Sequence, residues 1–355
     1  MVLNEKKILF ITALALGHIG RCLVIANKIS KNSKIYFSGP SNGLAEKIIS
    51  NKYPFIKIEY QKPGDLCFAN NLLNIIQNLK PDVICLDITP LPWLKYVNIT
   101  GIPQIFITNF FLTQLGTRKT LQDIYFEQHI NDINLFREKE KLTLWNNARE
   151  MYEGEKVILC DPPFLLSQEI KIPSHYHMVG PCCWEPDMPL PVELEKEENL
   201  LLLSFGSSGT VPISPLIIEE LAESLNINTV LWMGGNQHNI EQNNLKIKQL
   251  YYPWLPASKI LPKTMLVVSH GGAGSSYQAM MHGLPVGIWA SHKNQTILGE
   301  ILVEYGCGIF IEQLVKEKQI SMNINILQNK CNQFQDLILS SDGPCTAAKI
   351  ISRYL

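Results

Sequence analysis

Short apolar runs alternate with amphipathic stretches through the first half of the chain. Residues 7–12 form an apolar run that predicts a buried strand, and residues 19–29 have the spacing of a helix packed behind it. The alternation then repeats, as is typical of a doubly wound α/β sheet. Further strands are predicted at 34–37, 56–60, 83–87, 104–108 and 157–160, with helices at 72–79, at 92–97 and within 117–153.

The second half begins again with a buried strand at 200–205. Further strands are predicted at 229–233, 265–269, 286–289 and 309–311. The passage between the halves is rich in Pro and Glu, which is the composition of a linker. A chain of 355 residues is long for one core and suits two domains. We predict domains at 1–183 and 199–342, a linker at 184–198 and a closing helix within 343–355.

Composition narrows the functional classes. The formal net charge of −1 offers no electrostatic basis for binding nucleic acid. The 9 cysteines are scattered without a Cys-x-x-Cys pair, so we expect buried thiols in a reducing cytoplasm and no zinc site. The apolar run at 8–16 follows two lysines, as in a signal peptide, but a membrane span needs about 20 residues. A first buried strand explains it better, and we predict a cytoplasmic protein.

A glycine-rich turn between a strand and a helix is the strongest chemical feature. The apolar run at 265–268 predicts a strand covered on both faces, the turn His270-Gly271-Gly272-Ala273-Gly274-Ser275-Ser276 follows it, and 277–282 is predicted to be helical. Glycines let the backbone approach a ligand, and a helix start offers unpaired N–H groups with a positive dipole end. The combination predicts a binding site for a phosphate or diphosphate, although such turns are often plain connections.

The surrounding residues extend this motif into a family resemblance. The block resembles the donor-binding signature of family-1 glycosyltransferases of the GT-B fold, of the UDP-glycosyltransferase and macrolide glycosyltransferase type. The matching residues, in order, are Trp254, Pro256, His270, Gly271, Gly272, Gly274, Ser275, Gly283, Pro285 and Gln295. The resemblance implies two Rossmann-like domains with doubly wound parallel sheets facing across a cleft. It also implies that the last helix crosses back to the first domain.

The resemblance assigns donor-binding roles to residues of the second domain. It implies that the diphosphate meets His270, Gly272, Gly274 and Ser275 together with the turn Gly206, Ser207 and Ser208. It places the nucleobase against Trp254 and Leu255, and sugar hydroxyls against Gln295. Trp254 would equally suit a core, Gln295 an exposed surface and the 206–208 turn a simple connection.

Two positions depart from the family pattern. Gln278 stands where the family has a Glu that binds the ribose hydroxyls, and Asn294 stands where it has a sugar-binding Asp. Both changes remove a charged acceptor and keep an amide that still accepts a hydrogen bond. The donor would then differ from UDP-glucose, or binding would be weaker.

The first domain supplies the proposed catalytic pair. Gly17-His18 follows the first strand and resembles the family's Gly-His turn, whose His is the general base. Asp87 ends a run that resembles the family's Pro-Asp-x-x-x-x-Asp strand, whose last Asp orients that His. An imidazole titrates near neutral pH and a carboxylate fixes its tautomer, so the pair suits deprotonation of a hydroxyl. A lone His after a strand is more often structural, and the other motifs favour catalysis here.

The predicted reaction is an inverting displacement by an acceptor hydroxyl on a UDP- or dTDP-sugar, with no metal and no cofactor beyond the nucleotide sugar. The acceptor is a small molecule or a lipid. Residues 109–145 hold several aromatics that would line its pocket or only pack, and Phe110, Phe111 and Leu112 would suit a lipid or peripheral membrane contact.

Two alternatives remain open. Gly17-His18-Ile19-Gly20-Arg21 also resembles the start of sugar-nucleotide hydrolases of nonulosonic acid synthesis, which use water as acceptor. A non-catalytic nucleotide-binding partner would explain Gln278 and Asn294.

Overall fold

The chain folds into two compact units in the computed structural model. It describes residues 5–13, 15–29, 31–40, 44–58, 66–87, 99, 101–205, 213–234, 246–316 and 323–355. The N-terminal unit comprises 1–182 together with 342–355, and the C-terminal unit comprises 183–341. The last segment of the chain therefore belongs to the first unit.

A seven-stranded sheet forms the centre of the N-terminal unit, in the order β3-β2-β1-β4-β5-β6-β7. All of its paired strands run parallel. Residues 8–11 of β1 and 83–86 of β4 are almost wholly buried, as expected for parallel strands covered on both faces. The strands are β1 (Lys6–Thr12), β2 (Ser33–Pro40), β3 (Phe55–Ile58), β4 (Val83–Asp87), β5 (Gln104–Thr108), β6 (Lys156–Leu159) and β7 (Tyr176–Met178).

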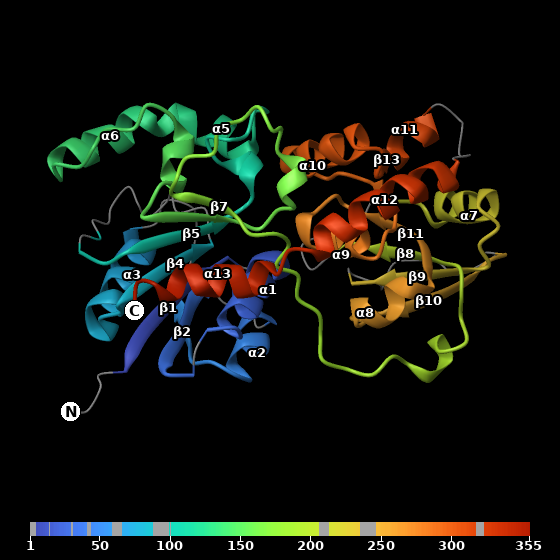
Figure 1. The fold of residues 1–355 in the computed structure, drawn as a ribbon, viewed down its shortest axis with the longest axis horizontal. Helices are drawn as coiled ribbons and strands as arrows, with labels where there is room; N and C mark the ends of the chain where they lie inside the picture. The colour runs from blue at the N-terminus through green and yellow to red at the C-terminus, as the bar shows by residue number, and fades with distance from the viewer. Residues whose placement is uncertain are drawn as a thin grey trace. The chain divides into compact units, whose positions relative to one another are not determined.

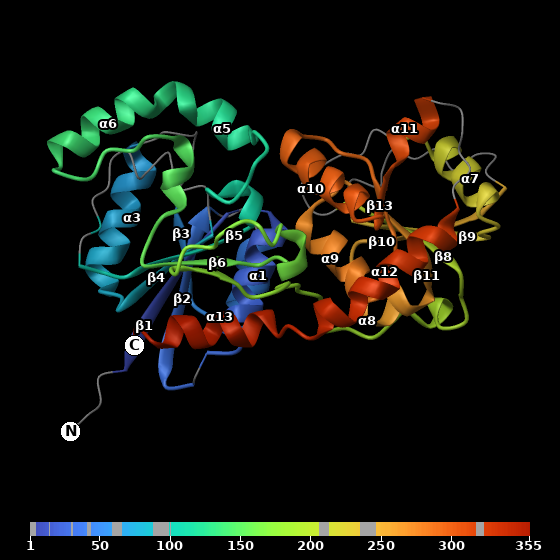
Figure 2. The same ribbon diagram turned by 45° about the horizontal axis from the view of Figure 1, so that its top comes forward.

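Helices cover both faces of this sheet. In Figures 1 and 2, α5 and α6 lie on one side of the strands, and α13 lies with α1 on the other. The α-helices are α1 (Leu16–Ala26), α2 (Leu44–Ser50), α3 (Leu66–Leu79), α5 (Leu121–Phe126), α6 (Ile130–Lys139) and α13 (Gly343–Ser352). The short 3₁₀ helices are η1 (Phe110–Leu112), η2 (Glu127–His129), η3 (Ala148–Tyr152) and η4 (Pro163–Leu165).

Helix α13 returns the chain to the N-terminal unit. The side chain of Asp342 caps the helix by accepting a hydrogen bond from the N–H of Cys345 at 3.0 Å. The helix packs against α1. A Cβ at Gly343 would lie 2.6 Å from the carbonyl oxygens of Gly180 and Pro181, so only glycine allows this close passage.

A six-stranded parallel sheet forms the centre of the C-terminal unit, in the order β10-β9-β8-β11-β12-β13. If the strands of each unit are numbered from the first strand of that unit, the order of this sheet is the same as that of the first six strands of the N-terminal sheet. The strands are β8 (Leu200–Ser204), β9 (Thr229–Met233), β10 (Lys248–Tyr252), β11 (Thr264–Ser269), β12 (Val286–Ile288) and β13 (Gly308–Phe310). The helices are η5 (Val192–Leu194), α7 (Pro215–Ser224), α8 (Ala257–Ile260), η7 (Leu261–Lys263), α9 (Ala273–Met281), α10 (Lys293–Glu304), α11 (Ile311–Lys316) and α12 (Ile324–Leu339).

Gly283 ends α9 in the left-handed region, with φ of +66°. Amide side chains of α12 satisfy the free carbonyls there: Gln335 donates to the carbonyl of Met281 at 3.0 Å, and Gln328 donates to that of Gly283. Helix α9 is thereby held at its C-terminal end while its N-terminal end stays at the sheet edge.

Several predicted elements have different bounds. Helix α1 begins at Leu16 and α9 at Ala273, so His18 and Gly274 lie in first helical turns instead of in the loops before them. The segment 117–153 is interrupted at 140–147, where Lys141 has φ of +56°. Strands β7 and β10 were not predicted, and the predicted helix at 92–97 lies outside the described residues.

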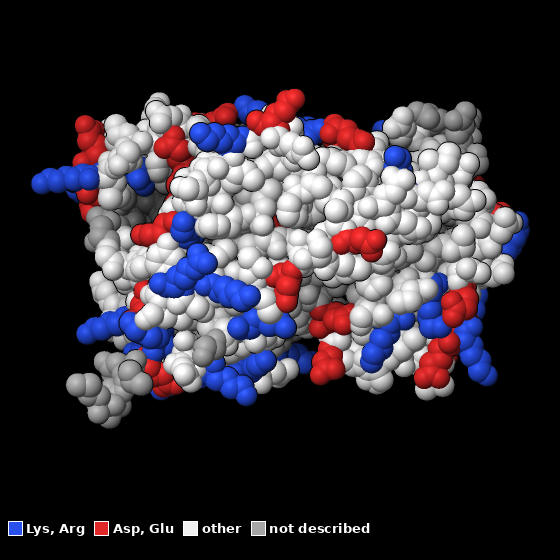
Figure 3. All heavy atoms as spheres, viewed as in Figure 1, with Lys and Arg blue, Asp and Glu red and all other residues white. Residues whose placement is uncertain are grey.

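Within the described residues, no helix combines the length and the apolar character that crossing a bilayer requires. On the face seen in Figure 3, Lys and Arg side chains are interspersed with Asp and Glu, and wide areas carry no charge. Phe110, Phe111 and Leu112 are at most 9% exposed. These three side chains therefore pack inside the protein and offer no apolar surface to a membrane, contrary to our expectation.

Candidate functional site

The His18–Asp87 pair of the N-terminal unit and the glycine-rich turn of the C-terminal unit each lie where the strand order of the sheet reverses. In the N-terminal unit this point lies between β1 and β4, and in the C-terminal unit it lies between β8 and β11. The loops that leave two such strands run to opposite sides, which opens a crevice at the carboxyl ends where ligands of α/β proteins bind.

His18 and Asp87 lie on the two sides of the reversal point in the N-terminal unit. Asp87 is the last residue of β4 and pairs in register with Thr12 at the end of β1. Helix α1 follows β1 and carries His18 in its first turn. Nδ1 of His18 lies 3.0 Å from Oδ1 of Asp87. The His18 side chain is 35% exposed and that of Asp87 only 1%, so the imidazole connects a buried carboxylate with the solvent.

Asp87 accepts hydrogen bonds from other groups besides facing His18. Arg21 donates to both carboxylate oxygens, through Nε and Nη2, and the thiol of Cys22 lies 3.4 Å from Oδ2. Two of these donors approach Oδ2 and one approaches Oδ1, and Nη2 of Arg21 also lies 3.1 Å from Nδ1 of His18. In the tautomer with the proton on Nδ1, the imidazole donates to Asp87 and Nε2 keeps a free lone pair. A neutral imidazole in this tautomer can accept a proton from a hydroxyl.

Ionisation of the groups around Asp87 follows from their burial. Burial alone would lower the pKa of Arg21, but the charge and hydrogen bonds of Asp87 outweigh it, and the pKa is raised above its usual value. The pKa of the Cys22 thiol is raised, first by burial and then by the charge of Asp87. Arg21 thus stays charged, and Cys22 stays a neutral donor.

Two further polar residues join this cluster, and neither was assigned a role from the sequence. Asn109 follows β5 and accepts from Nη1 of Arg21 at 2.8 Å. Asp161 follows β6 and accepts from Nδ2 of Asn109 at 2.7 Å. Both lie at the carboxyl ends of strands, as Asp87 does. The sequence feature that could have identified them is a polar residue directly after each predicted strand.

The glycine-rich turn lies at the carboxyl end of β11 in the C-terminal unit. Gly271 has φ of +80°, and its N–H donates to Oγ of Ser269 at 3.1 Å. Gly272 then caps α9, which leaves the first N–H groups of that helix without partners inside the helix. A Cβ built at Gly274 has no atom within 4 Å, so the first turn of α9 borders open space. This geometry suits the approach of a phosphate.

His270 is a neutral side chain next to this helix start. Burial, and secondly the charge of His292, lower its pKa to about 4. A Cβ at Gly272 would lie 2.6 Å from Nε2 of His270, so the ring packs directly on the glycine. Nδ1 of His270 is buried without a hydrogen-bond partner among the described residues. At neutral pH the side chain can offer a single N–H donor and no positive charge.

The side chains of Ser204 and Ser275 link the end of β8 to the start of α9, the helix that follows β11. Ser204 ends β8, Ser275 lies in the first turn of α9, and their hydroxyl oxygens are 3.1 Å apart. Ser276, which was not assigned a role, is fully buried, and its Oγ has no partner among the described residues. The turn Gly206, Ser207 and Ser208 follows β8 directly but lies outside the described residues.

The candidate nucleobase residues differ in how accessible they are. Trp254 is half-buried and meets Trp184 edge to face, with ring centroids 6.5 Å apart. Leu255 is 2% exposed, so only its backbone is available to a ligand. Nε2 of Gln278 donates to the carbonyl of Trp184 at 3.0 Å, which leaves the amide oxygen for other partners.

The last candidate pair begins α10. Gln295 is buried, and its Oε1 accepts from both the N–H and the hydroxyl of Ser291 at 2.8 Å, so the amide oxygen is occupied within its own loop. Asn294 is half-buried. Among the described residues no group of three His, Cys, Asp or Glu side chains is placed to hold a metal ion.

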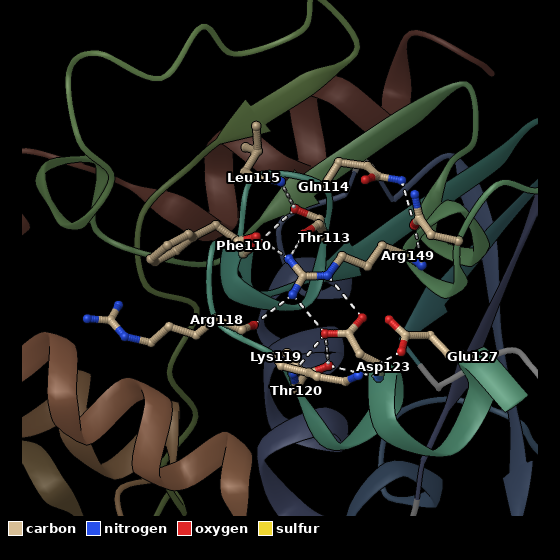
Figure 4. Close-up of polar contacts among 12 residues, drawn as sticks. Phe110, Thr113, Gln114, Leu115, Arg118, Lys119, Thr120, Asp123, Glu127 and Arg149 are labelled. Carbon is tan, nitrogen blue, oxygen red and sulfur yellow. Dashed lines mark hydrogen bonds and ion pairs between the residues drawn. The ribbon is translucent and has the colours of Figure 1, made fainter.

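The loop that follows η1 is organised around Arg149. Its guanidinium donates to the carbonyls of Thr113, Gly116 and Arg118 and forms an ion pair with Asp123 at 2.7 Å. Figure 4 shows the guanidinium enclosed by these groups, while the Arg118 side chain points away from it. The loop at the carboxyl end of β5 is therefore held from within. Part of the predicted acceptor segment 109–145 is this rigid loop.

Comparisons with known proteins show what the chain is similar to. A family model described as erythromycin biosynthesis protein CIII-like, C-terminal domain, matches residues 239–335. A PGL/p-HBAD biosynthesis glycosyltransferase of Mycobacterium tuberculosis (strain ATCC 25177 / H37Ra) is 23% identical over 355 residues, which cover 87% of this chain and 82% of that protein. The crystal structure of the kitacinnamycin glycotransferase has a TM-score of 0.74 at 17% identity, covering 99% of this chain and 100% of that one.

The chain is a GT-B glycosyltransferase. The fold class expected from the sequence is confirmed. The glycosyltransferase SsfS6 of Streptomyces sp. SF2575, complexed with thymidine diphosphate, has the same fold, with a TM-score of 0.69 at 14% identity over 98% of this chain and 99% of that one. In the present glycosyltransferase the family-matched range includes every candidate donor residue except Gly206, Ser207 and Ser208.

Proposed function

We propose that this glycosyltransferase moves a sugar from a nucleoside diphosphate sugar to a hydroxyl group, with inversion at the anomeric carbon. The observation that carries the proposal is the His18–Asp87 pair, with Nδ1 3.0 Å from a buried carboxylate and the ring partly open to solvent. Nε2 of His18 would take the proton of the acceptor hydroxyl as its oxygen attacks the anomeric carbon. Asp87 would stabilise the imidazolium that forms.

The C-terminal unit would bind the donor. The N–H groups at the start of α9 and the open space at Gly274 suit a diphosphate, and the structure of SsfS6 was determined with thymidine diphosphate. We assign UDP- or dTDP-sugars as donors on this basis. The backbone dipoles and the neutral N–H of His270 would stabilise the charge on the leaving diphosphate, so the proposal assigns no metal to the reaction.

The acceptor would be a small molecule or a lipid that carries a hydroxyl. The loop held by Arg149 lies at the carboxyl end of β5, next to β4 and Asp87 in the sheet, and is a candidate for acceptor contact.

The test is nucleotide release from a panel of UDP- and dTDP-sugars, measured with and without a panel of phenolic and aliphatic alcohols and with or without EDTA. Transfer predicts release that depends on an alcohol, resists EDTA and yields a product of inverted anomeric configuration by NMR. Equal release without any alcohol would instead identify a hydrolase. Binding of nucleotide sugar without turnover would identify a non-catalytic protein.

A further inference from the structure

Arg21 lies at the centre of a buried chain of polar side chains that crosses the carboxyl edge of the N-terminal sheet. Helix α1 after β1 carries His18 and Arg21, β4 ends with Asp87, Asn109 follows β5 and Asp161 follows β6. These four strands are neighbours in the order β1-β4-β5-β6. Arg21, Asp87, Asn109 and Asp161 are each at most 7% exposed. The cluster is therefore a continuous polar layer inside an apolar unit.

The guanidinium of Arg21 determines how Asp87 is oriented. Nε donates to Oδ2 and Nη2 donates to Oδ1, so the carboxylate is held at both oxygens and cannot rotate. Nη2 also lies 3.1 Å from Nδ1 of His18, because both nitrogens approach the same oxygen. With Nη2 on Oδ1, a single direction of approach remains for the imidazole.

Asn109 and Asp161 hold Arg21 from its other side. An Asn side chain can face a guanidinium only with its oxygen and a carboxylate only with its nitrogen, and Asn109 does both. The second oxygen of Asp161 accepts from the N–H of Phe110 at 2.7 Å. With both oxygens of Asp161 facing N–H donors, the hydrogen bonds run in one direction, from Phe110 and Asn109 to Asp161 and from Arg21 to Asn109.

We propose that Arg21 is a positioning residue for His18, held by Asn109 and Asp161 and acting through Asp87. The inference rests on the proposed role of His18 as base. Arg21 fixes the carboxylate so that Nδ1 keeps its proton and Nε2 points outward with a lone pair. The buried set carries one positive charge and two negative charges, so it becomes neutral when His18 accepts a proton. The positive charge of Arg21 disfavours protonation of His18, and the negative charge of Asp161 compensates for that effect.

The charged and titratable groups that face His18 and Arg21 come from three elements. They are Asp87 of β4, Cys22 of α1 and Cys160 after β6, while Asp161 is linked to Arg21 through Asn109. A purely structural arginine would need only the pair with Asp87. The link to the imidazole is Oδ1 of Asp87, which both Nη2 of Arg21 and Nδ1 of His18 approach.

The first test reads the tautomer of His18 directly and needs no substrate. The protein is labelled with ¹⁵N-histidine, and the resonance of His18 among the 8 histidines is assigned by its loss in His18→Gln. The wild type should show the proton on Nδ1. Arg21→Met should show both tautomers, and so should Arg21→Lys, because an ammonium keeps the charge but cannot hold both oxygens in fixed geometry. Arg137→Met, on α6, is the matched control and should keep the wild-type tautomer.

Arg21→Lys also covers the case in which Arg21→Met does not fold. Asn109→Ala adds a milder variant that keeps the Arg21–Asp87 pair and removes the support of Nη1. An unchanged Nδ1–H tautomer in every Arg21 and Asn109 variant that folds would overturn the proposal.

The second test is kinetic. Arg21→Lys should lower kcat by about 10- to 100-fold, less than the 10²- to 10⁴-fold typical of losing a general base. The Kd for nucleotide should not change. In a His18→Ala background, Arg21→Lys should have no further effect, because its influence passes through the imidazole. An equal loss in both backgrounds would indicate a structural role and overturn the proposal. Full turnover in His18→Ala alone would instead refute the base, whatever the tautomer of His18.

Discussion

Nδ1 of His18 lies 3.0 Å from Oδ1 of Asp87, although the two residues are 69 positions apart in the chain. Strands β1 and β4 are parallel neighbours in register, so both chains reach the same sheet edge at the same level. The order of the sheet reverses between these two strands, and there the side chains of α1 and β4 can meet without obstruction from a crossing loop. The candidate base therefore depends on strand order as much as on residue type.

His18→Ala should abolish turnover and leave nucleotide binding intact. Removing a general base typically lowers kcat by 10² to 10⁴. Because His18 belongs to the N-terminal unit and the glycine-rich turn to the C-terminal unit, the Kd for dTDP or UDP should stay within about twofold. Steady-state kinetics and calorimetry measure the two quantities.

The control for this variant is His175→Ala. His175 precedes β7, and its Nε2 lies 2.6 Å from Oε2 of Glu153, at the end of the sheet opposite to His18. Its replacement should leave kcat unchanged. A parallel loss of kcat and nucleotide affinity in His18→Ala would argue against the assignment of His18.

Gly274→Ala should separate the role of the helix start in binding from its role in stability. A Cβ at Gly274 meets no atom, and alanine is favoured over glycine in a helix by up to about 1 kcal/mol, so the free protein should be equally or more stable. The same Cβ would enter the space through which a phosphate approaches, and the Kd for nucleotide should rise at least tenfold. Thermal melting and calorimetry give both values.

Gly283→Ala is the matched comparison at the other end of α9. Here φ is +66°, and an L-residue in the left-handed region costs about 1–2 kcal/mol. We expect a less stable protein whose nucleotide affinity at low temperature is unchanged. If Gly274→Ala kept its full affinity for nucleotide, no phosphate would bind at this helix start.

His270 should make the stability of the enzyme depend on pH. Its pKa is lowered to about 4 in the folded state, mainly by burial, while an unfolded chain has the ordinary value near 6.5. The unfolded state therefore binds the proton first as the pH falls. This contribution leaves stability unchanged above pH 6.5 and lowers the free energy of unfolding by about 3 kcal/mol between pH 6.5 and pH 4.

The measurement compares urea unfolding of the wild type and His270→Asn at pH 7, 5.5 and 4.5. The variant has no imidazole to titrate, so its stability should fall less on acidification. Identical pH dependence in the two proteins would show that His270 is not buried as described. A bound diphosphate should raise the pKa of His270, so nucleotide binding at pH 5 should take up protons, which calorimetry in buffers of different ionisation enthalpy detects.

Arg149→Met should destabilise the N-terminal unit. The change leaves the carboxylate of Asp123 buried without its ion pair and removes donors from three carbonyls, and breaking a buried pair on one side costs about 3–5 kcal/mol. Burial raises the pKa of Asp123, but the hydrogen bonds from Arg149 and Thr120 outweigh it and lower the pKa below its usual value. The stabilisation is therefore present at neutral pH and is lost in acid.

Arg137→Met is the control for this variant. Arg137 is half-buried over the ring of Trp145 at 4.4 Å, and its Nε donates to the carbonyl of Thr143 at 2.6 Å, contacts worth about 1–2 kcal/mol together. Urea unfolding should show a smaller cost than that of Arg149→Met. Equal costs would mean that the loop at the end of β5 does not depend on Arg149.

The residue pattern was enough to predict most of the parallel strands and the glycine-rich turn between β11 and α9. Buried parallel strands such as β4 are continuous apolar runs, and this pattern does not depend on which elements pack on them. Local patterns failed where tertiary contacts decide the outcome. Strand β10 is only partly buried and has no long apolar run, and the start of α1 passes through Gly17 without any capping side chain to mark it.

Which polar residues meet depends on the three-dimensional fold. Arg21, Asn109 and Asp161 are ordinary residues in the sequence, and their meeting depends on the strand order β1-β4-β5-β6. The return of α13 to the first unit and the hydrogen bond of Gln278 to the carbonyl of Trp184 are likewise contacts between distant segments. Side-chain periodicity reports which face of an element is buried, but it carries no information about which other element buries it.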